Sequence, residues 1–209
     1  MRGIFVTLEG GEGAGKTTIM HTVAKELEKR GYDVMQTREP GGIKIAEQIR
    51  GIILDTNNTE MDARCEALLY AAARRQHLIE KVQPALRENK IVLCDRFVDS
   101  SIVYQGIARD IGVEEVWQMN QFAIEGNMPE ITIFFDLTPE VGLARIAANE
   151  QREVNRLDLE GLEFHKLVYQ GYKQQCEKHP DRIVAINASE SIEAVTQTVL
   201  NLIIEKLTR

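Results

Sequence analysis

The feature that most constrains this chain is a glycine-rich stretch at residues 10–18, which reads GGEGAGKTT. The stretch fits the pattern G-x-x-x-x-G-K-[ST], known as the phosphate-binding loop or P-loop. An apolar run at residues 4–8 precedes it, and the residues after it place Val23, Ala24 and Leu27 on one stripe of a helix. The loop therefore lies at a strand-to-helix turn, which is the context that this motif requires.

The P-loop predicts a binding site for the phosphates of a nucleoside triphosphate. Small residues let successive backbone N–H groups point inward, and the start of the following helix adds its dipole. Lys16 is expected to reach the β- and γ-phosphates, and the Thr17 hydroxyl to hold Mg²⁺. A glycine-rich turn without a ligand is the alternative. The expected triphosphate-binding residues are Gly10, Gly11, Glu12, Gly13, Ala14, Gly15, Lys16, Thr17 and Thr18.

The composition is ordinary for a soluble globular protein, with 44% hydrophobic and 27% charged residues. A net charge of -7 argues against a broad surface for nucleic acid or a membrane, although a local cleft can still bind a small anion. No apolar run approaches the ~18 residues of a membrane span. Three widely spaced cysteines favour neither a disulfide framework nor a metal site. We therefore expect a cytoplasmic protein.

Five apolar runs alternate with amphipathic helical patterns along the chain. This alternation predicts an α/β fold in which a five-stranded parallel sheet carries helices on both faces. No linker divides the chain, so we expect a single domain over residues 1–209. The expected strands are residues 4–8, 33–37, 91–95, 131–136 and 183–187, and the expected helices lie near residues 17–30, 43–55, 60–88, 113–125, 139–149, 158–178 and 189–207.

Ligands of open α/β sheets bind at the carboxyl ends of the strands, so the residues after each expected strand are candidates. Arg38 follows the second strand and would project toward a second phosphate, although a solvated loop explains it too. Asp95 and Arg96 follow the third strand. Asp95 resembles a carboxylate that holds Mg²⁺, directly or through water, or acts as a general base; Glu160 is another candidate ligand. Arg96 would bridge donor and acceptor phosphates, and a local ion pair is the alternative.

A polar face is expected on the long helix near residues 60–83. Glu66, Tyr70 and Arg74 are four residues apart, and His77 follows three residues later, so all four share one face. Periodicity alone leaves open whether this face is exposed or forms one wall of a pocket. The apolar residues expected to lie in the core beside it are Leu68, Leu69, Ala72 and Ile79.

A polar segment at about residues 149–160 has few apolar anchors. Arg152 and Arg156 are four residues apart and would face the same side of a helix. One interpretation is a mobile lid that brings both arginines onto the transferring phosphoryl group. An exposed charged helix is the alternative.

Taken together, five stretches resemble bacterial thymidylate kinases, which are P-loop nucleoside-monophosphate kinases. The P-loop alone is shared by many proteins, and the four stretches after it are far more specific. The resemblance covers nearly the whole chain. The stretches are residues 9–18 (EGGEGAGKTT), 37–42 (TREPGG), 66–77 (EALLYAAARRQH), 95–101 (DRFVDSS) and 104–106 (YQG).

The resemblance implies ATP- and Mg²⁺-dependent phosphorylation of dTMP to dTDP, a step in dTTP synthesis, by a homodimer. It implies that Arg38 and Arg96 bind phosphates and that Arg74 and Gln105 contact the thymine. Tyr70 stands where the family more often has Phe to stack on the base. Glu12 would approach the sugar 3′-hydroxyl, and the lid arginines would assist catalysis. The implied substrate-binding set is Arg38, Glu39, Pro40, Arg50, Tyr70, Arg74, Arg96, Ser100, Ser101, Gln105 and Arg109.

Two alternatives to this function stay open. One is another small P-loop nucleotide or small-molecule kinase, and the other is a regulatory P-loop ATPase that acts as a switch. For the implied dimer, an apolar set could supply part of the interface, but an intramolecular core explains the same pattern. That set is Val113, Val116, Trp117 and Phe122.

Overall fold

The computed structural model describes residues 3–148 and 156–208. Its centre is a parallel five-stranded sheet in the order β2-β3-β1-β4-β5, which confirms the predicted α/β fold. All five strands lie within one residue of their expected bounds. They are β1 (Ile4–Glu9), β2 (Val34–Arg38), β3 (Ile91–Asp95), β4 (Ile131–Asp136) and β5 (Ile183–Asn187).

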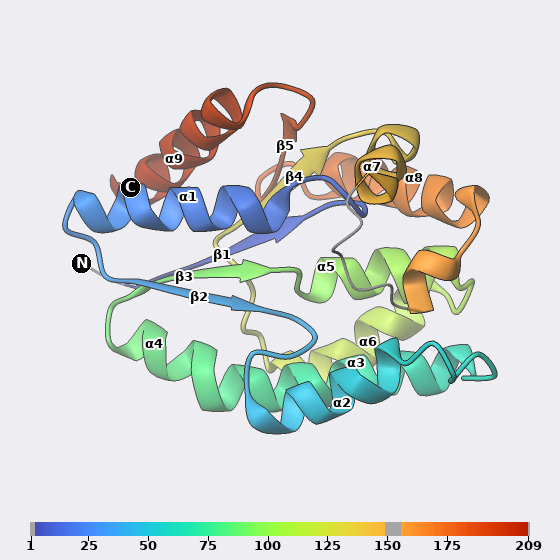
Figure 1. Ribbon diagram of the computed structural model, residues 1–209. Helices are drawn as coiled ribbons and strands as arrows, with labels where there is room; N and C mark the ends of the chain where they lie inside the picture. Colours follow the sequence, from blue (N-terminus) through green and yellow to red (C-terminus); the bar gives the residue numbers. More distant parts are fainter. Residues whose placement is uncertain (1–2, 149–155, 209) are drawn as a thin grey trace.

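Helices cover both faces of this sheet (Figure 1). Alternate side chains of β1 point to opposite faces. Ile4, Val6 and Leu8 pack with α1 (Lys16–Lys29) and α9 (Ile192–Thr208), whereas Phe5 packs with η1 (Leu78–Val82) and α4 (Gln83–Arg87). Because both sheet faces are covered, the inner strands β1, β3 and β4 are buried along almost their whole length, whereas the edge strands β2 and β5 are partly exposed. The helical segments of the described chain are α1 (Lys16–Lys29), α2 (Lys44–Leu54), α3 (Ala63–His77), η1 (Leu78–Val82), α4 (Gln83–Arg87), α5 (Val98–Ser101), η2 (Ile102–Ala108), α6 (Val113–Ile124), α7 (Pro139–Ala147), η3 (Arg156–Leu159), α8 (Leu162–Lys178) and α9 (Ile192–Thr208).

The sheet register aligns the carboxyl ends of three neighbouring strands, β2, β3 and β1. Asp95 of β3 pairs with Leu8 of β1 on one side and with Arg38 of β2 on the other. The loops that follow these strands therefore start at one edge of the sheet, where parallel α/β folds bind their ligands.

The long helix predicted over residues 60–88 is divided into three parts. It starts after Asp62, whose carboxylate accepts hydrogen bonds from two backbone N–H groups of the first turn. A π-helical turn, η1, separates α3 from α4, and Pro84 lies in the first turn of α4. Proline is tolerated there because the N–H groups at the start of a helix have no intrahelical partner.

The core positions expected on α3 are wrong. Leu68, Ala72 and Ile79 (which lies in η1) are exposed, and Leu69 is half-buried. Glu66, Arg74 and His77 of the polar face are buried. Periodicity assigns polar residues to the surface, but these three find buried hydrogen-bond partners in other elements. The polar face is thus the wall of a buried site.

The helical segments α5 and η2, at residues 98–108, are absent from the predicted elements. All residues from Ile102 to Gly106 are buried, so the segment has no polar face to produce a helical period.

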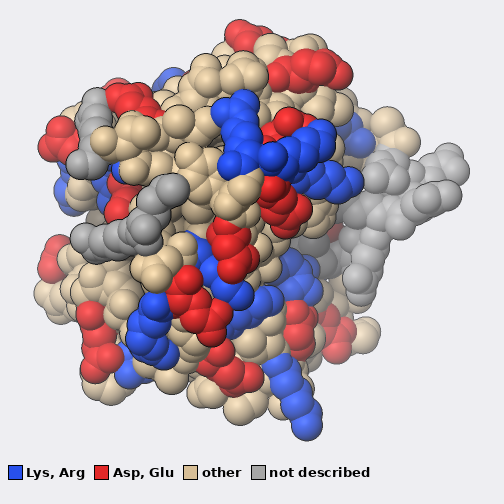
Figure 2. Space-filling model, turned by 90° about the vertical axis from the view of Figure 1, so that its left-hand side faces the viewer, with Lys and Arg blue, Asp and Glu red and all other residues tan. Residues whose placement is uncertain are grey.

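None of the described helices is long and apolar enough to cross a membrane. The face seen in Figure 2 lies at the amino ends of the strands and mixes Lys and Arg with Asp and Glu. That face therefore offers no broad positive surface of the kind that binds nucleic acid.

Candidate active site

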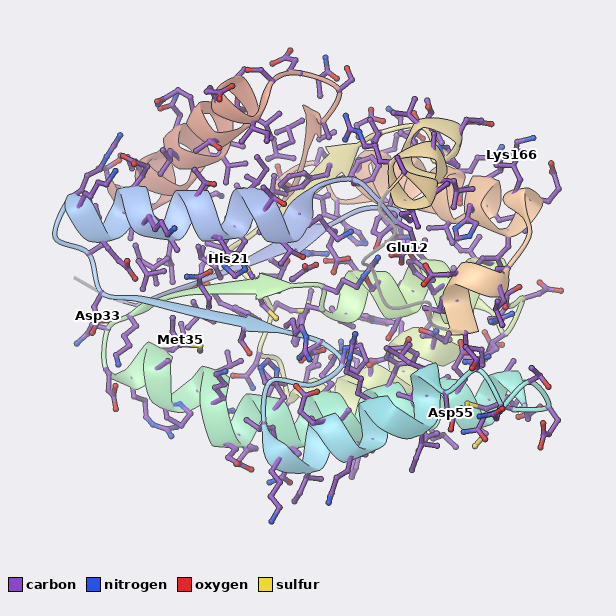
Figure 3. The ribbon with its side chains drawn as sticks, in the orientation of Figure 1. Glu12, His21, Asp33, Met35, Asp55 and Lys166 are labelled. Atoms are coloured by element: carbon purple, nitrogen blue, oxygen red, sulfur yellow. The ribbon has the colours of Figure 1, made fainter. Side chains whose placement is uncertain are left out.

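The candidate site lies at the carboxyl ends of β1, β2 and β3. Glu12 lies at this edge in Figure 3, whereas Asp33, just before β2, lies at the opposite end of the sheet. Two cavities meet here, and we call them the phosphate cavity and the acceptor pocket after the groups that the P-loop and the strand-end residues are expected to bind.

The phosphate cavity, about 460 Å³, is formed by the P-loop and the elements beside it. Gly13 and Gly15 have φ angles of 71° and 86°, which other L-residues rarely adopt, so the loop conformation requires glycine at both positions. The residues that line the cavity are Glu12, Gly13, Ala14, Gly15, Lys16, Thr17, Thr18, Asp95, Arg96, Arg145 and Ile146. Gly10 and Gly11, the remaining two expected triphosphate-binding residues, precede this lining, and their carbonyl oxygens accept from Lys16 Nζ at 3.0 and 2.9 Å.

Lys16 is almost fully buried below this cavity. Burial and the neighbouring Arg96 guanidinium lower the pKa of Lys16 to about 8, while the carboxylates of Asp95, Glu12 and Glu9 act in the opposite direction. A bound phosphate would add negative charge and raise this pKa again.

Thr17 and Asp95, the two residues expected to hold a metal ion, are in direct contact. Thr17 Oγ1 donates to Asp95 Oδ2 at 2.6 Å. The other candidate ligand, Glu160, is instead paired with Arg109 at 2.5 Å.

Helix α7 packs directly against the P-loop through two glycines. A Cβ on Gly142 would lie 2.2 Å from the carbonyl oxygen of Glu12, and a Cβ on Gly13 would lie 2.1 Å from that of Gly142. This approach brings Arg145 of α7 to the phosphate cavity. Arg145 was missed from the sequence because nothing in the local pattern of α7 points to the P-loop.

Arg96 lies between the two cavities. Its φ of 70° is rare for a residue with a side chain. Its guanidinium donates to Glu12 Oε1 at 2.6 Å and to the carbonyl oxygen of Gly10 at 3.0 Å, and it lies 5.1 Å from the ring centroid of Tyr104. Glu12 and Arg96 line both cavities.

The acceptor pocket, about 120 Å³, contains most of the residues expected to bind the second substrate. Leu54, Phe97, Tyr104 and Leu157 were not expected there, because apolar side chains in a pocket look like core residues in the sequence. The full lining is Glu12, Glu39, Pro40, Arg50, Leu54, Tyr70, Arg74, Arg96, Phe97, Ser100, Ser101, Tyr104, Gln105 and Leu157.

Arg74 is buried at the base of this pocket with most of its donors occupied. Nε donates to Glu39 at 2.8 Å, one NH2 hydrogen goes to the Phe97 carbonyl at 3.0 Å, and NH1 serves both Ser101 and Asn120. A guanidinium has five N–H donors, so four are committed and one is left for a ligand. Asn120, on α6, is a supporting residue that the sequence did not indicate.

Arg38 and Arg50 differ in their position relative to the acceptor pocket. Arg38 makes a bidentate ion pair with Glu47 of α2, at 2.6 and 3.0 Å, and does not line the acceptor pocket. Arg50 lines the pocket and donates to the carbonyl oxygen of Pro40 at 3.1 Å.

Of the two arginines expected in a lid, Arg152 lies outside the described residues. Arg156 is buried, donates to the Ile53 carbonyl at 2.9 Å and pairs with Glu66. In this structure it therefore contacts the acceptor side and not the P-loop.

Residues 8–199 match the family model described as thymidylate kinase, and every described site residue lies in that range. The chain belongs to the thymidylate kinase family.

Individual relatives agree with this family. The thymidylate kinase of Oceanobacillus iheyensis is 57% identical over 203 residues, which cover 97% of this chain and 90% of that protein. The thymidylate kinase of Bacillus licheniformis is 57% identical over 207 residues, covering 99% and 98%. The crystal structure of thymidylate kinase from Ehrlichia chaffeensis superposes with a TM-score of 0.78 at 30% identity, covering 97% of this chain and 99% of that one.

Proposed function

We propose that this thymidylate kinase transfers the γ-phosphoryl group of ATP to dTMP and so produces dTDP for dTTP synthesis. The observation that carries the proposal is that Glu12 and Arg96 line both the phosphate cavity and the acceptor pocket. A donor phosphate in one cavity and an acceptor phosphate in the other would meet at this pair.

Arg96 is proposed to stabilise the transferring phosphoryl group. Both phosphates carry negative charge, and a guanidinium fixed between them offsets their repulsion and the charge that develops in the transition state. Lys16 supports the donor side from its buried position in the P-loop.

Magnesium is proposed at Thr17 and Asp95. A hydroxyl and a carboxylate 2.6 Å apart beside the phosphate cavity fit a hard cation that takes most of its other oxygens from phosphate and water. Among residues 3–148 and 156–208 there is no group of three His, Cys, Asp or Glu side chains that could hold a metal ion. Mg²⁺ is commonly held by one or two protein ligands together with substrate phosphates and water. When bound, the ion would neutralise charge on the β- and γ-phosphates.

The acceptor pocket is proposed to bind dTMP through its base, sugar and phosphate. The free donor of Arg74 suits a thymine carbonyl, Gln105 suits the N3 edge, and Tyr70 offers a ring for stacking. Ser100, Ser101, Glu39, Pro40 and Arg50 complete the lining, and Arg109 lies behind it against Glu66.

Glu12 is proposed to contact the sugar 3′-hydroxyl of dTMP. Its carboxylate is held by Arg96 on the acceptor side, which offsets the cost of an acid beside the phosphates. Arg38 would reach the acceptor phosphate only after leaving Glu47. Arg152 keeps its proposed role in a lid at about residues 149–160. Arg156 would take that role only after leaving Glu66 and the Ile53 carbonyl.

The protein is further proposed to be a single cytoplasmic domain that forms a homodimer. One set of large apolar side chains is exposed on neighbouring helices α2, α3 and α6: Ile45, Ile52, Leu68 and Phe122. Of the apolar residues first considered for an interface, Val116 is buried and Trp117 packs partly into the core, whereas Phe122 is 88% exposed. We assign the interface to these three helices because large exposed apolar side chains favour association.

The substrate is tested by measuring ADP release from ATP with each common nucleoside monophosphate in turn. Turnover is expected to require a monophosphate and to be most efficient with dTMP. Equal rates with dCMP or AMP would contradict the substrate, and hydrolysis without any monophosphate would favour a regulatory ATPase.

The catalytic role of Arg96 is tested with Arg96→Ala. We expect kcat to fall by about 10³-fold or more while ATP binding, measured by calorimetry, changes little. Arg75→Ala is the matched control, because Arg75 pairs with Glu125 away from both cavities. Equal losses of kcat and ATP affinity in Arg96→Ala would refute the role.

A further inference from the structure

We propose that Glu66 determines which pyrimidine the acceptor pocket accepts, because its carboxylate fixes the orientation of the Gln105 side-chain amide. In that orientation the amide presents its carbonyl oxygen to the ligand and selects a base with a hydrogen on ring N3. The inference rests on the proposed function, in which the acceptor is a pyrimidine nucleoside monophosphate.

The contact between these two side chains is buried. Gln105 Nε2 donates to Glu66 Oε1 at 2.8 Å, and the two residues are 2% and 1% exposed. They lie on different elements, η2 and α3, and are 39 residues apart in the chain.

The second oxygen of Glu66 is held by arginines. Oε2 accepts from Arg156 and, at 3.5 Å, from Arg109. A carboxylate that forms ion pairs with two guanidinium groups acts only as a hydrogen-bond acceptor. Glu66 therefore has no hydrogen to offer Gln105.

Because Glu66 only accepts hydrogen bonds, it fixes the orientation of the Gln105 side-chain amide. If the Gln105 amide were rotated by 180°, its oxygen would face Glu66 Oε1 at hydrogen-bond distance, and two buried acceptors would oppose each other. Nε2 therefore stays on Glu66. The other polar atom, Oε1, is left for the pocket that Gln105 lines.

The resulting pocket offers an acceptor from Gln105 and a donor from Arg74. Thymine and uracil carry a hydrogen on N3 and a carbonyl at C4, so they match this pair. Cytosine has a bare N3 and an amino group at C4, so it places an acceptor against an acceptor and a donor against a donor. A site built to hydrogen-bond one pattern rejects the reversed pattern because buried polar groups are left unpaired.

The test is Glu66→Gln, with kcat/KM measured for dTMP, dUMP and dCMP. A glutamine at position 66 has its own donor, so both orientations of the Gln105 amide become possible. We expect the preference for dTMP over dCMP to fall by about tenfold or more. The preference for dTMP over dUMP is the internal control, because both bases carry the N3 hydrogen and differ only in a methyl group.

A second variant exchanges the two residues. In the double variant Glu66→Gln/Gln105→Glu, the new amide donates to the new carboxylate, whose other oxygen again faces the pocket. The preference for dTMP over dCMP should recover at least partly relative to Glu66→Gln alone. Folding of each variant is checked by the rise in melting temperature on adding ATP. If Glu66→Gln does not fold, Glu66→Asp, which withdraws the carboxylate from Gln105, replaces it with the same expected direction.

The outcomes separate this inference from the proposed function. If the wild-type protein uses dCMP as well as dTMP, the proposed function fails. If the wild type prefers dTMP and the folded Glu66 variants keep that preference unchanged, the role of Glu66 is refuted. An equal loss of kcat/KM for all three pyrimidines would also refute it, because a structural defect does not distinguish N3.

Discussion

The substitution Glu9→Gln should remove a loss of folding stability that the wild-type protein shows as pH rises from about 5 to about 8. Glu9 ends β1 just before the P-loop and is fully buried. Its carboxylate accepts from the Phe97 backbone N–H at 2.7 Å, from Ser100 Oγ at 2.5 Å and from Tyr172 Oη at 2.8 Å. Burial, followed by the nearby charge of Asp99, raises the pKa of Glu9 from 4.5 to about 7, against the opposing effect of these hydroxyls and of Arg96.

The sign of the effect follows from proton binding. Between pH 4.5 and about 7 the folded protein keeps a proton on Glu9 that the unfolded chain has released. The stability from this group is fully present below the unfolded pKa and is lost as pH rises through the folded pKa. The full difference corresponds to about 3 kcal/mol in the free energy of unfolding. For a chain of this size, that is a shift of roughly 6–12 °C in melting temperature.

The assay is urea unfolding of wild type and Glu9→Gln at about pH 5 and about pH 8. The change in stability between the two pH values should be more negative in the wild type than in the variant by up to about 3 kcal/mol. Any hydrogen bonds that glutamine fails to make cost the same free energy at both pH values. This cost cancels when the change in stability between about pH 5 and about pH 8 is compared for the two proteins. Glu163→Gln is the matched control, because that side chain is 84% exposed. Identical pH dependence in wild type and Glu9→Gln would refute the reasoning.

Three further substitutions test other parts of the structure. Gly142→Ala should weaken ATP binding measured by calorimetry, because its Cβ would lie 2.2 Å from the Glu12 carbonyl oxygen; unchanged affinity would contradict the close packing of α7 on the P-loop. Gly51→Ala, within α2 and with open space around it, should stabilise the protein by about 1 kcal/mol in urea unfolding, and a loss of stability would contradict the helix assignment. Phe122→Asp should shift the protein toward monomer in sedimentation velocity, and an unchanged mass would exclude this face as the interface.

Much of the fold could be predicted because its signals are local. The five strands are short apolar runs, and each has a neighbouring amphipathic pattern that leaves only a parallel sheet with covered faces. The P-loop is equally local, since Gly13 and Gly15 adopt backbone conformations that require glycine at those positions.

The prediction failed where burial and polarity no longer go together. On α3 the polar residues Glu66, Arg74 and His77 are buried and the apolar Leu68 is exposed, because ion pairs and hydrogen bonds from other elements satisfy the polar groups. Residues 98–108 are helical without a helical period for the related reason that every side of the segment is covered. Hydrophobic periodicity reports a helix that buries one apolar face, whereas α3 buries a face that carries polar residues and Ile102–Gly106 has no exposed face.

The sequence by itself determined that a triphosphate-binding loop joins a buried strand to a helix, and that arginines follow the ends of neighbouring strands. Only the tertiary structure decided which of those arginines meet. Arg96 lies between two cavities, while Arg38 is held outside the acceptor pocket by Glu47. Likewise, Glu66 and Gln105 meet because α3 and η2 pack together. Backbone conformation is encoded over a few residues, whereas the partner of a buried charge depends on elements brought together from across the whole chain.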